Sequence, residues 1–180
     1  MGSGDAKFYG AAALGSKVYF VPFAGDVVGV LDTAASAGQA QFSTISLDES
    51  LREYTFMGCT VVGSKIVFVP WYRGDAIVIL DTAGNEGDGV ISTICLQDKV
   101  HGDFKFSGAA VVGSKVYFAP YNADVVGVYD TAANEGHGSF DTISLEGKVR
   151  GHYKFNGSAV VGDKVYFAPS NAGVVGVVDT

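Results

Sequence analysis

The chain of 180 residues repeats itself at a nearly constant interval. An Asp-Thr pair recurs every 49 residues, at Asp32, Asp81, Asp130 and Asp179. A second mark, a residue followed by Phe-x-Gly, begins at Lys7, Thr55, Lys105 and Lys154, and its copies lie 48, 50 and 49 residues apart. All four prolines occupy a single position of the repeat, at Pro22, Pro70, Pro120 and Pro169. A period of this length indicates an array of supersecondary units.

Each unit contains short apolar runs, and turn residues separate these runs at intervals of about ten residues. In the third unit the runs are GAAVVG, KVYFAP, VVGVYDT and FDTISL, and β-branched and aromatic residues dominate them. Such residues favour strands, and no amphipathic helical pattern is present. A Gly-Ser or Gly-Asp pair between the first two runs suits a tight hairpin, and the proline that ends the second run stops ladder pairing. Each unit therefore predicts a four-stranded antiparallel meander.

Tandem four-stranded meanders of this length predict an all-β fold, a β-propeller, with one blade for each repeat. Small residues in the first run agree, because the innermost strands of all blades converge near the axis. A β-trefoil would need three units, and a solenoid would need shorter turns. We expect one domain over 1–180, with blades at 7–54, 55–104 and 105–153 and a partial blade at 154–180.

The fourth repeat ends after its third run, so its blade is predicted to be incomplete. Three arrangements stay open at this point: a closed four-bladed ring with one thin blade, a larger ring made with a second copy, or a piece of a longer repeat protein. An uncovered strand edge invites pairing with another chain. A homodimer through the incomplete last blade is therefore kept as an alternative.

The phrases GAAVVGSKVYFAPYNADVVGVYDT and GSAVVGDKVYFAPSNAGVVGVVDT carry a family resemblance. They resemble the tandem repeats of uncharacterised propeller-like proteins of unicellular marine algae and bacteria, and more distantly the blades of kelch proteins. The likeness covers nearly the whole chain and implies the propeller fold without an activity. The double glycine and spaced Tyr/Trp signature of kelch repeats is not present as such, so kelch partners are not inferred.

Copy-to-copy variation predicts a binding surface on one rim. Antiparallel alternation places the loops after the second and fourth strands of every blade on the same rim. Directly after each proline the copies differ, which a purely structural position would not require. The candidate ligand-binding residues there are Phe23, Trp71, Tyr72, Arg73, Tyr121, Asn122 and Asn171. Aromatic rings beside amide and charged groups suit a protein or glycan contact. The alternative is that the rings cover loop ends against neighbouring blades.

Lys105, Lys154 and His152 are further candidates, because lysines that precede the inner strand would surround the channel mouth and attract an anion. The alternative pairs Lys7, Lys105 and Lys154 with the aspartates at the start of the third strands, which are Asp26, Asp75 and Asp124. This pairing within a blade is imperfect, because Asp75 belongs to the blade with Thr55 and Gly173 replaces the aspartate in the fourth blade.

Charge and motifs argue against several other functions. The net charge of −7 disfavours nucleic acid and anionic membranes as partners, and no apolar stretch is long enough for a spanning helix. The spacing of Cys59 and Cys95 fits neither a zinc site nor a disulfide framework, and both are expected to be buried thiols. No three histidines converge, no nucleophile or phosphate-binding motif occurs, and neither metal nor cofactor is predicted.

These features favour a non-enzymatic binding or scaffold module that uses one propeller rim. Replacement of Trp71 and Tyr72 by Ala is expected to abolish binding without unfolding the protein. One alternative is a hydrolase or lyase at the axial channel mouth, with Lys105, Lys154 and His152 as its working groups. Another is an engineered or truncated repeat array without a native ligand. A soluble cytoplasmic protein is favoured, although the sequence does not fix the compartment.

Overall fold

A computed structural model describes residues 6–23, 25–35, 39–84 and 89–180. Nearly all regular structure in it is β. The first blade contains β1 (Phe8–Leu14), β2 (Lys17–Pro22), β3 (Val27–Asp32) and β4 (Gln41–Ser46). The second contains β5 (Phe56–Val62), β6 (Lys65–Pro70), β7 (Ala76–Asp81) and β8 (Val90–Cys95). The third contains β9 (Phe106–Val112), β10 (Lys115–Pro120), β11 (Val125–Asp130) and β12 (Ser139–Ser144). The fourth contains β13 (Phe155–Val161), β14 (Lys164–Pro169) and β15 (Gly176–Asp179). Two short 3-10 turns, η2 (Glu49–Leu51) and η4 (Asn134–Gly136), lie between strands.

The four sheets are antiparallel meanders in which every strand pairs with the next one along the chain. The first three sheets have four strands each, and the fourth has three, in the order β13-β14-β15. The predicted all-β propeller fold with an incomplete last blade is therefore confirmed. The proline of each repeat is the last residue of its second strand, where the missing N–H costs no ladder bond.

The Asp-Thr pairs hold neighbouring turns by hydrogen bonds, as expected of residues that stabilise turns. In the third blade, the Asp130 carboxylate accepts hydrogen bonds from the Ala132 N–H at 3.0 Å and from the Ser114 hydroxyl at 2.8 Å. The Thr131 hydroxyl donates to the Ser114 carbonyl at 2.9 Å. These bonds, the one from the Ala132 backbone first, lower the pKa of Asp130. The same contacts recur around Asp32 and Asp81, so these carboxylates serve the turns.

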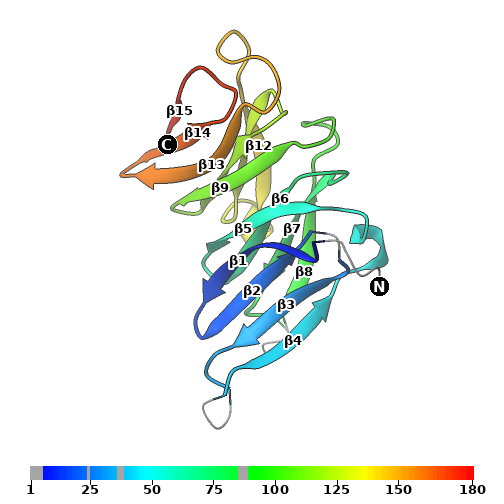
Figure 1. Ribbon diagram of the computed structural model, residues 1–180. Coiled ribbons are helices and arrows are strands. Elements are labelled where there is room, and N and C mark those ends of the chain that lie inside the picture. Colours follow the sequence, from blue (N-terminus) through cyan, green and yellow to red (C-terminus); the bar gives the residue numbers. More distant parts are fainter. Residues whose placement is uncertain (1–5, 24, 36–38, 85–88) are drawn as a thin grey trace.

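The blades stand side by side in an open arc (Figure 1). The inner strands follow one another in the order β1, β5, β9 and β13, and each lies against the next. β1 and β13 stand at the two ends of this row, so the four blades do not meet in a closed four-bladed ring. Within the described residues, one face of the first blade and one face of the fourth blade meet no other blade.

The apolar core is divided into three clusters, one at each blade interface. Tyr19 and Val28 of the first blade pack with Phe56 and Phe68 of the second. Further clusters join the second blade to the third and the third to the fourth. A blade buries its apolar face only against the next blade, as in other repeat proteins. Stability therefore depends mainly on contacts between neighbouring repeats.

Glycines on the inner strands permit the closest of these contacts. A Cβ atom built at Gly108 of β9 would lie 2.8 Å from the Gly157 Cα of β13, and one at Gly10 would lie 2.8 Å from the Gly58 Cα. Real Cβ atoms do not approach backbone so closely. This crowding is the physical reason for the small residues that the sequence places on the first strand of each blade.

We predict that Gly108→Ala destabilises the protein by about 1–3 kcal/mol, because the added methyl group forces two inner strands apart. Gly173→Ala is the matched control, since a Cβ atom there has no heavy atom within 4 Å. It should change the free energy of unfolding by less than about 0.5 kcal/mol. Urea titration followed by Trp71 fluorescence measures both values. Equal effects of the two substitutions would contradict the close backbone contact.

Candidate functional site

The loops after the second and fourth strands meet on one rim, as predicted. The N–H groups of Trp71, Tyr121 and Ser170, each directly after a proline, donate to the carbonyls of Thr55, Lys105 and Lys154 at the start of the inner strands. The rim also joins neighbouring blades, since the Lys154 N–H donates to the Tyr121 carbonyl at 2.9 Å. Backbone bonds thus hold the rim loops of successive blades together.

A continuous row of five aromatic rings runs along this rim. We call it the rim row; its members are Tyr72, Phe104, Trp71, Tyr121 and Tyr153. Ring centroids of successive members lie 5.2, 5.1, 4.6 and 4.9 Å apart. These distances are those of favourable aromatic pairs. The row starts on the second blade, crosses the third and ends on the loop that enters the fourth.

The rings of the rim row differ in how much of their surface is free. Trp71 is only 8% exposed, whereas Tyr153 is 46% exposed and the other three are half-buried. Trp71 thus lies against the blades beneath it, which matches the alternative in which rings cover loop ends. The accessible part of the row belongs to its tyrosines and Phe104.

Charged side chains flank the two ends of the rim row. The Arg73 guanidinium lies 5.4 Å from the centroid of the Tyr72 ring and 3.3 Å from the Glu53 carboxylate. His152 is exposed at the other end, with its ring centroid 6.3 Å from that of Tyr153. Apolar ring surface therefore has polar groups at both ends.

Three residues of this rim have left-handed backbone. Arg73, Phe104 and Tyr153 have φ values of 53°, 55° and 58°. This region costs residues other than Gly free energy and persists only where the surroundings hold it. At Phe104 and Tyr153 the conformation accompanies contact with the rings of the preceding blade.

Sequence reasoning missed Phe104 and Tyr153. Both stand directly before a lysine that opens an inner strand, in the phrases DFKF and HYKF, and Tyr54 occupies that position in EYTF. The recurrent aromatic residue there was the available signal.

The remaining candidates lie outside the rim row. Phe23 is half-buried, and its ring centroid lies 5.7 Å from that of Tyr9 on the first blade. Asn171 is exposed on the fourth blade. Asn122 joins blades, because its side-chain oxygen accepts a hydrogen bond from the Tyr153 N–H at 3.0 Å. Only some of the predicted residues are thus brought together.

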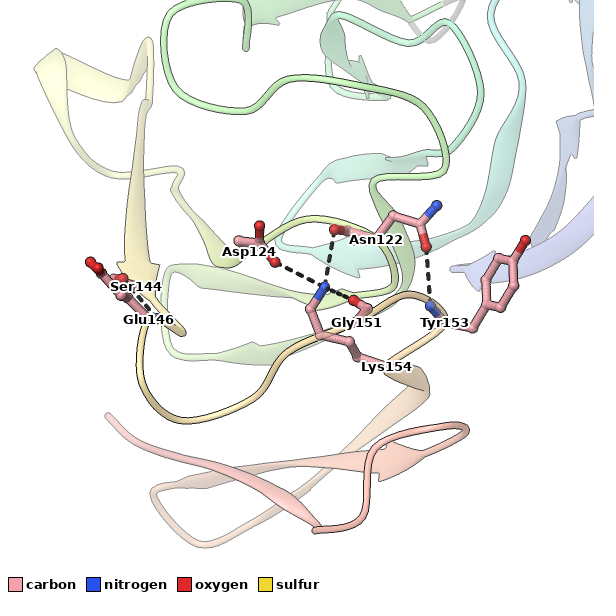
Figure 2. A network of polar contacts seen from close by, with 7 residues as sticks. All are labelled: Asn122, Asp124, Ser144, Glu146, Gly151, Tyr153 and Lys154. Carbon is pink, nitrogen blue, oxygen red and sulfur yellow. Dashed lines mark hydrogen bonds and ion pairs between the residues drawn. The ribbon is translucent and has the colours of Figure 1, made fainter.

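Lys105 and Lys154 lie inside the blade interfaces, each 1% exposed. Figure 2 shows Lys154 with its partners Asp124, Asn122 and Gly151. The Lys154 ammonium lies 3.1 Å from the Asp124 carboxylate and donates to the carbonyls of Asn122 and Gly151 at 3.0 and 2.7 Å. Lys105 donates to the Asp75 carboxylate at 3.0 Å. The lysines thus pair with aspartates at the start of third strands, as in the alternative drawn from the sequence, but that alternative paired them within one blade. In the structure each lysine pairs with the aspartate of the preceding blade.

The ion pairs form only where the repeat supplies both partners. The second blade has Thr55 in place of the lysine, so Asp26 of the first blade has no such lysine opposite it. At the Lys105 pair, the hydrogen bond from the ammonium is the main cause that lowers the pKa of Asp75.

The two cysteines differ in environment. Cys59 is half-buried rather than fully buried, and desolvation raises its pKa to about 12. Cys95 is exposed, so the expectation of a buried thiol was wrong there. It stands near the end of β8, the outermost strand of its blade, where the sheet leaves it uncovered.

Within the described ranges no three His, Cys, Asp or Glu side chains gather as a metal site would need. The same part of the chain contains no helix that is long and apolar enough to cross a membrane.

Comparisons with known proteins give information on the fold of this chain and none on its activity. No protein-family model matches the chain, and no curated protein matches it. Among solved structures it is similar to apo AztD from Citrobacter koseri, with a TM-score of 0.61 and 15% identity over 96% of this chain and 44% of the other.

Two further solved structures show the same similarity. A proposed 6-phosphogluconolactonase from Bacteroides uniformis has a TM-score of 0.62 and 11% identity over 92% of this chain and 50% of that one. The computationally designed Ika8 protein has a TM-score of 0.58 and 12% identity over 95% and 45%. This chain spans half or less of the length of these three proteins. The similarity establishes a propeller-like repeat fold, which serves many functions.

We predict that Asp75→Asn destabilises the protein by about 1–2 kcal/mol, because the buried Lys105 ammonium loses its charged partner. The matched change Asp124→Asn should cost less, since Lys154 keeps two carbonyl acceptors. Urea titration at neutral pH gives both values. Equal losses would contradict this difference between the two interfaces.

The Asp75 ion pair also predicts a pH dependence. The pKa of Asp75 in the folded state lies below the ordinary aspartate value of about 3.9. The ion pair therefore contributes its full stabilisation at a pH above that value. This contribution is lost as the pH falls through the lower pKa of the folded state. The stability difference between the wild type and Asp75→Asn should therefore shrink as the pH falls below about 4. A difference that stays constant would argue against the ion pair.

Proposed function

We propose that this chain is a non-enzymatic binding module and that the rim row holds a segment of another protein. The continuous row of rings across three blades carries this proposal. Exposed aromatic surface with charged groups at its edge is typical of contact sites in protein interfaces.

Variation between the repeats supports a role beyond the scaffold. The position after the proline is Phe23, Trp71, Tyr121 and Ser170 in the four blades, although the backbone bond that it makes is the same in each. A position that served the fold alone would read alike in every copy. The rim row therefore combines a common backbone with side chains particular to each blade.

Ring orientation favours a protein over a glycan as the partner. Four of the five rings meet a neighbour at a tilt of 49° to 66°, and each ring contacts the next. A sugar needs a flat ring face free for stacking, whereas a peptide side chain fits between tilted rings. A glycan remains the alternative that the experiment tests.

The hydrolase or lyase alternative is less well supported. It would use Lys105 and Lys154 together with His152. Both lysine ammonium groups are already bound by carboxylates, and in Lys154 also by carbonyls. A lysine so occupied offers a substrate neither a nucleophile nor an exposed charge.

The double variant Tyr72→Ala/Tyr153→Ala tests the proposal, because both rings are accessible members of the rim row. This double variant is preferred to one that changes Trp71 and Tyr72, because truncation of the buried Trp71 would itself lower the free energy of unfolding by about 3–5 kcal/mol. The wild type is panned against a displayed library of short peptides and applied to a glycan array. We expect selected peptides to bind the wild type and the double variant to lose at least about tenfold in affinity.

Tyr9→Ala is the matched control, because Tyr9 is an aromatic residue of similar exposure outside the rim row. Its affinity for the selected peptides should equal that of the wild type. Selected peptides that bind the double variant as well as the wild type would disprove the proposed surface. Binding on the glycan array alone would assign the row to a sugar.

A further inference from the structure

One end of the rim row carries a cation that the chain itself supplies. The Arg73 guanidinium lies 5.4 Å from the centroid of the Tyr72 ring, and its Nη1 donates to the Glu53 carboxylate at 3.3 Å. A guanidinium suits this combination, because its plane stacks on an aromatic ring while its N–H groups reach a carboxylate. The second blade thus shows which kind of side chain a tyrosine of the rim row accepts.

The third blade has no such cation in its own loop. PWYRGD of the second blade aligns with PYNAD of the third, where Asn122 and Ala123 follow Tyr121 and no arginine is present. Tyr121 contacts Tyr153, the most exposed ring of the row, with ring centroids 4.9 Å apart and a tilt of 49°. In Figure 2 the Tyr153 ring extends away from the Lys154 ammonium and its partners. Ring surface that the second blade covers with its own arginine is therefore open in the third.

Asp103 occupies in the third blade the repeat position that Glu53 occupies in the second, because DFKF aligns with EYTF. Asp103 is exposed, and its Oδ1 accepts a hydrogen bond from the Arg73 N–H at 3.3 Å, which holds it at the rim. The Asn122 N–H donates to the Phe104 carbonyl at 3.0 Å, so the loop of the third blade lies against the residue next to Asp103. The third blade therefore has the rings and the carboxylate but not the arginine.

The charges around the open rings favour a basic partner. The loop that enters the fourth blade carries Arg150, which lines a cavity of about 590 Å³ together with Asp124 and Glu146. These two carboxylates stand near the charge of Arg150, and the whole chain has a net charge of −7. A field of this sign attracts cationic segments.

We propose that the segment held by the rim row carries an arginine, which binds over Tyr121 and Tyr153 with Asp103 as its charged partner. This arginine takes the place in the third blade that Arg73 takes in the second. The proposal rests on the function proposed above and adds the side chain that the rim row selects. Arginine is favoured over lysine, because the compact ammonium of lysine has no plane that could stack on a ring.

The peptides that the wild type selects from the displayed library test this choice. We expect an arginine in every selected peptide that the Tyr72→Ala/Tyr153→Ala variant fails to bind. Synthetic versions with citrulline in place of that arginine keep the shape of the side chain and remove its charge. Titration calorimetry should show a loss of at least about tenfold in affinity with citrulline, and a smaller loss with lysine.

Two results would overturn the inference and leave the proposed function standing. One is a set of peptides that bind the rim row without an arginine. The other is equal affinity of the arginine and citrulline versions. If the library yields no binding peptide, the proposed function fails and the inference fails with it.

Asp103→Asn tests the charged partner. Asparagine keeps the shape of the side chain and the oxygen that accepts the Arg73 N–H. We expect the arginine peptide to lose at least about fivefold in affinity for this variant. The citrulline peptide should bind the variant and the wild type equally, because no charge is left to pair. Additive losses from the two changes would show that the two groups do not meet, and would contradict the proposal.

Asp163→Asn is the matched control, because it removes the same charge on the opposite rim. Asp163 is exposed in the turn between β13 and β14, where the other blades have a serine: Ser16, Ser64 and Ser114. The arginine peptide should bind this variant as it binds the wild type. Equal losses in Asp103→Asn and Asp163→Asn would reveal a general attraction to a negative protein and contradict a specific contact.

Discussion

The packing of each blade against its neighbour determines the rest of this structure. A single four-stranded sheet buries little apolar surface alone, and the three core clusters all lie between blades. Gly108 and Gly157 bring inner strands within backbone contact, and the buried Lys154 joins the same pair of blades at the rim. Close approach at the inner strands and polar bonds at the rim thus fix one interface, which the chain repeats with variations.

The proposed rim surface is a consequence of that interface. At the rim, it brings the loop after one blade's proline against the aromatic residue that opens the next blade, so that rings from three blades form one row.

The periodicity of the sequence was sufficient to predict the strands, the hairpins and the order of the sheets. Turn residues and alternation are local, and the Asp130 contacts followed from the Asp-Thr spacing alone. The candidate site was less accessible, because exposure depends on contacts between blades. Trp71 was a natural choice as a lone tryptophan in a loop, yet the third blade buries it. Lys105 and Lys154 were candidates for free charge, and partners from the preceding blade bind them. The open arc likewise depends on the angle between blades, which no local pattern specifies.

Amide hydrogen exchange of the intact protein tests most directly whether contacts between blades stabilise the sheets. β9 and β12 are the two edge strands of the same sheet, but β9 lies between the inner strands β5 and β13 of the neighbouring blades. Backbone groups in closely packed regions exchange more slowly than those with few contacts. The account predicts slow exchange for the amides of Phe106–Val112 and faster exchange for those of Ser139–Ser144. Equal protection of the two strands would contradict the account.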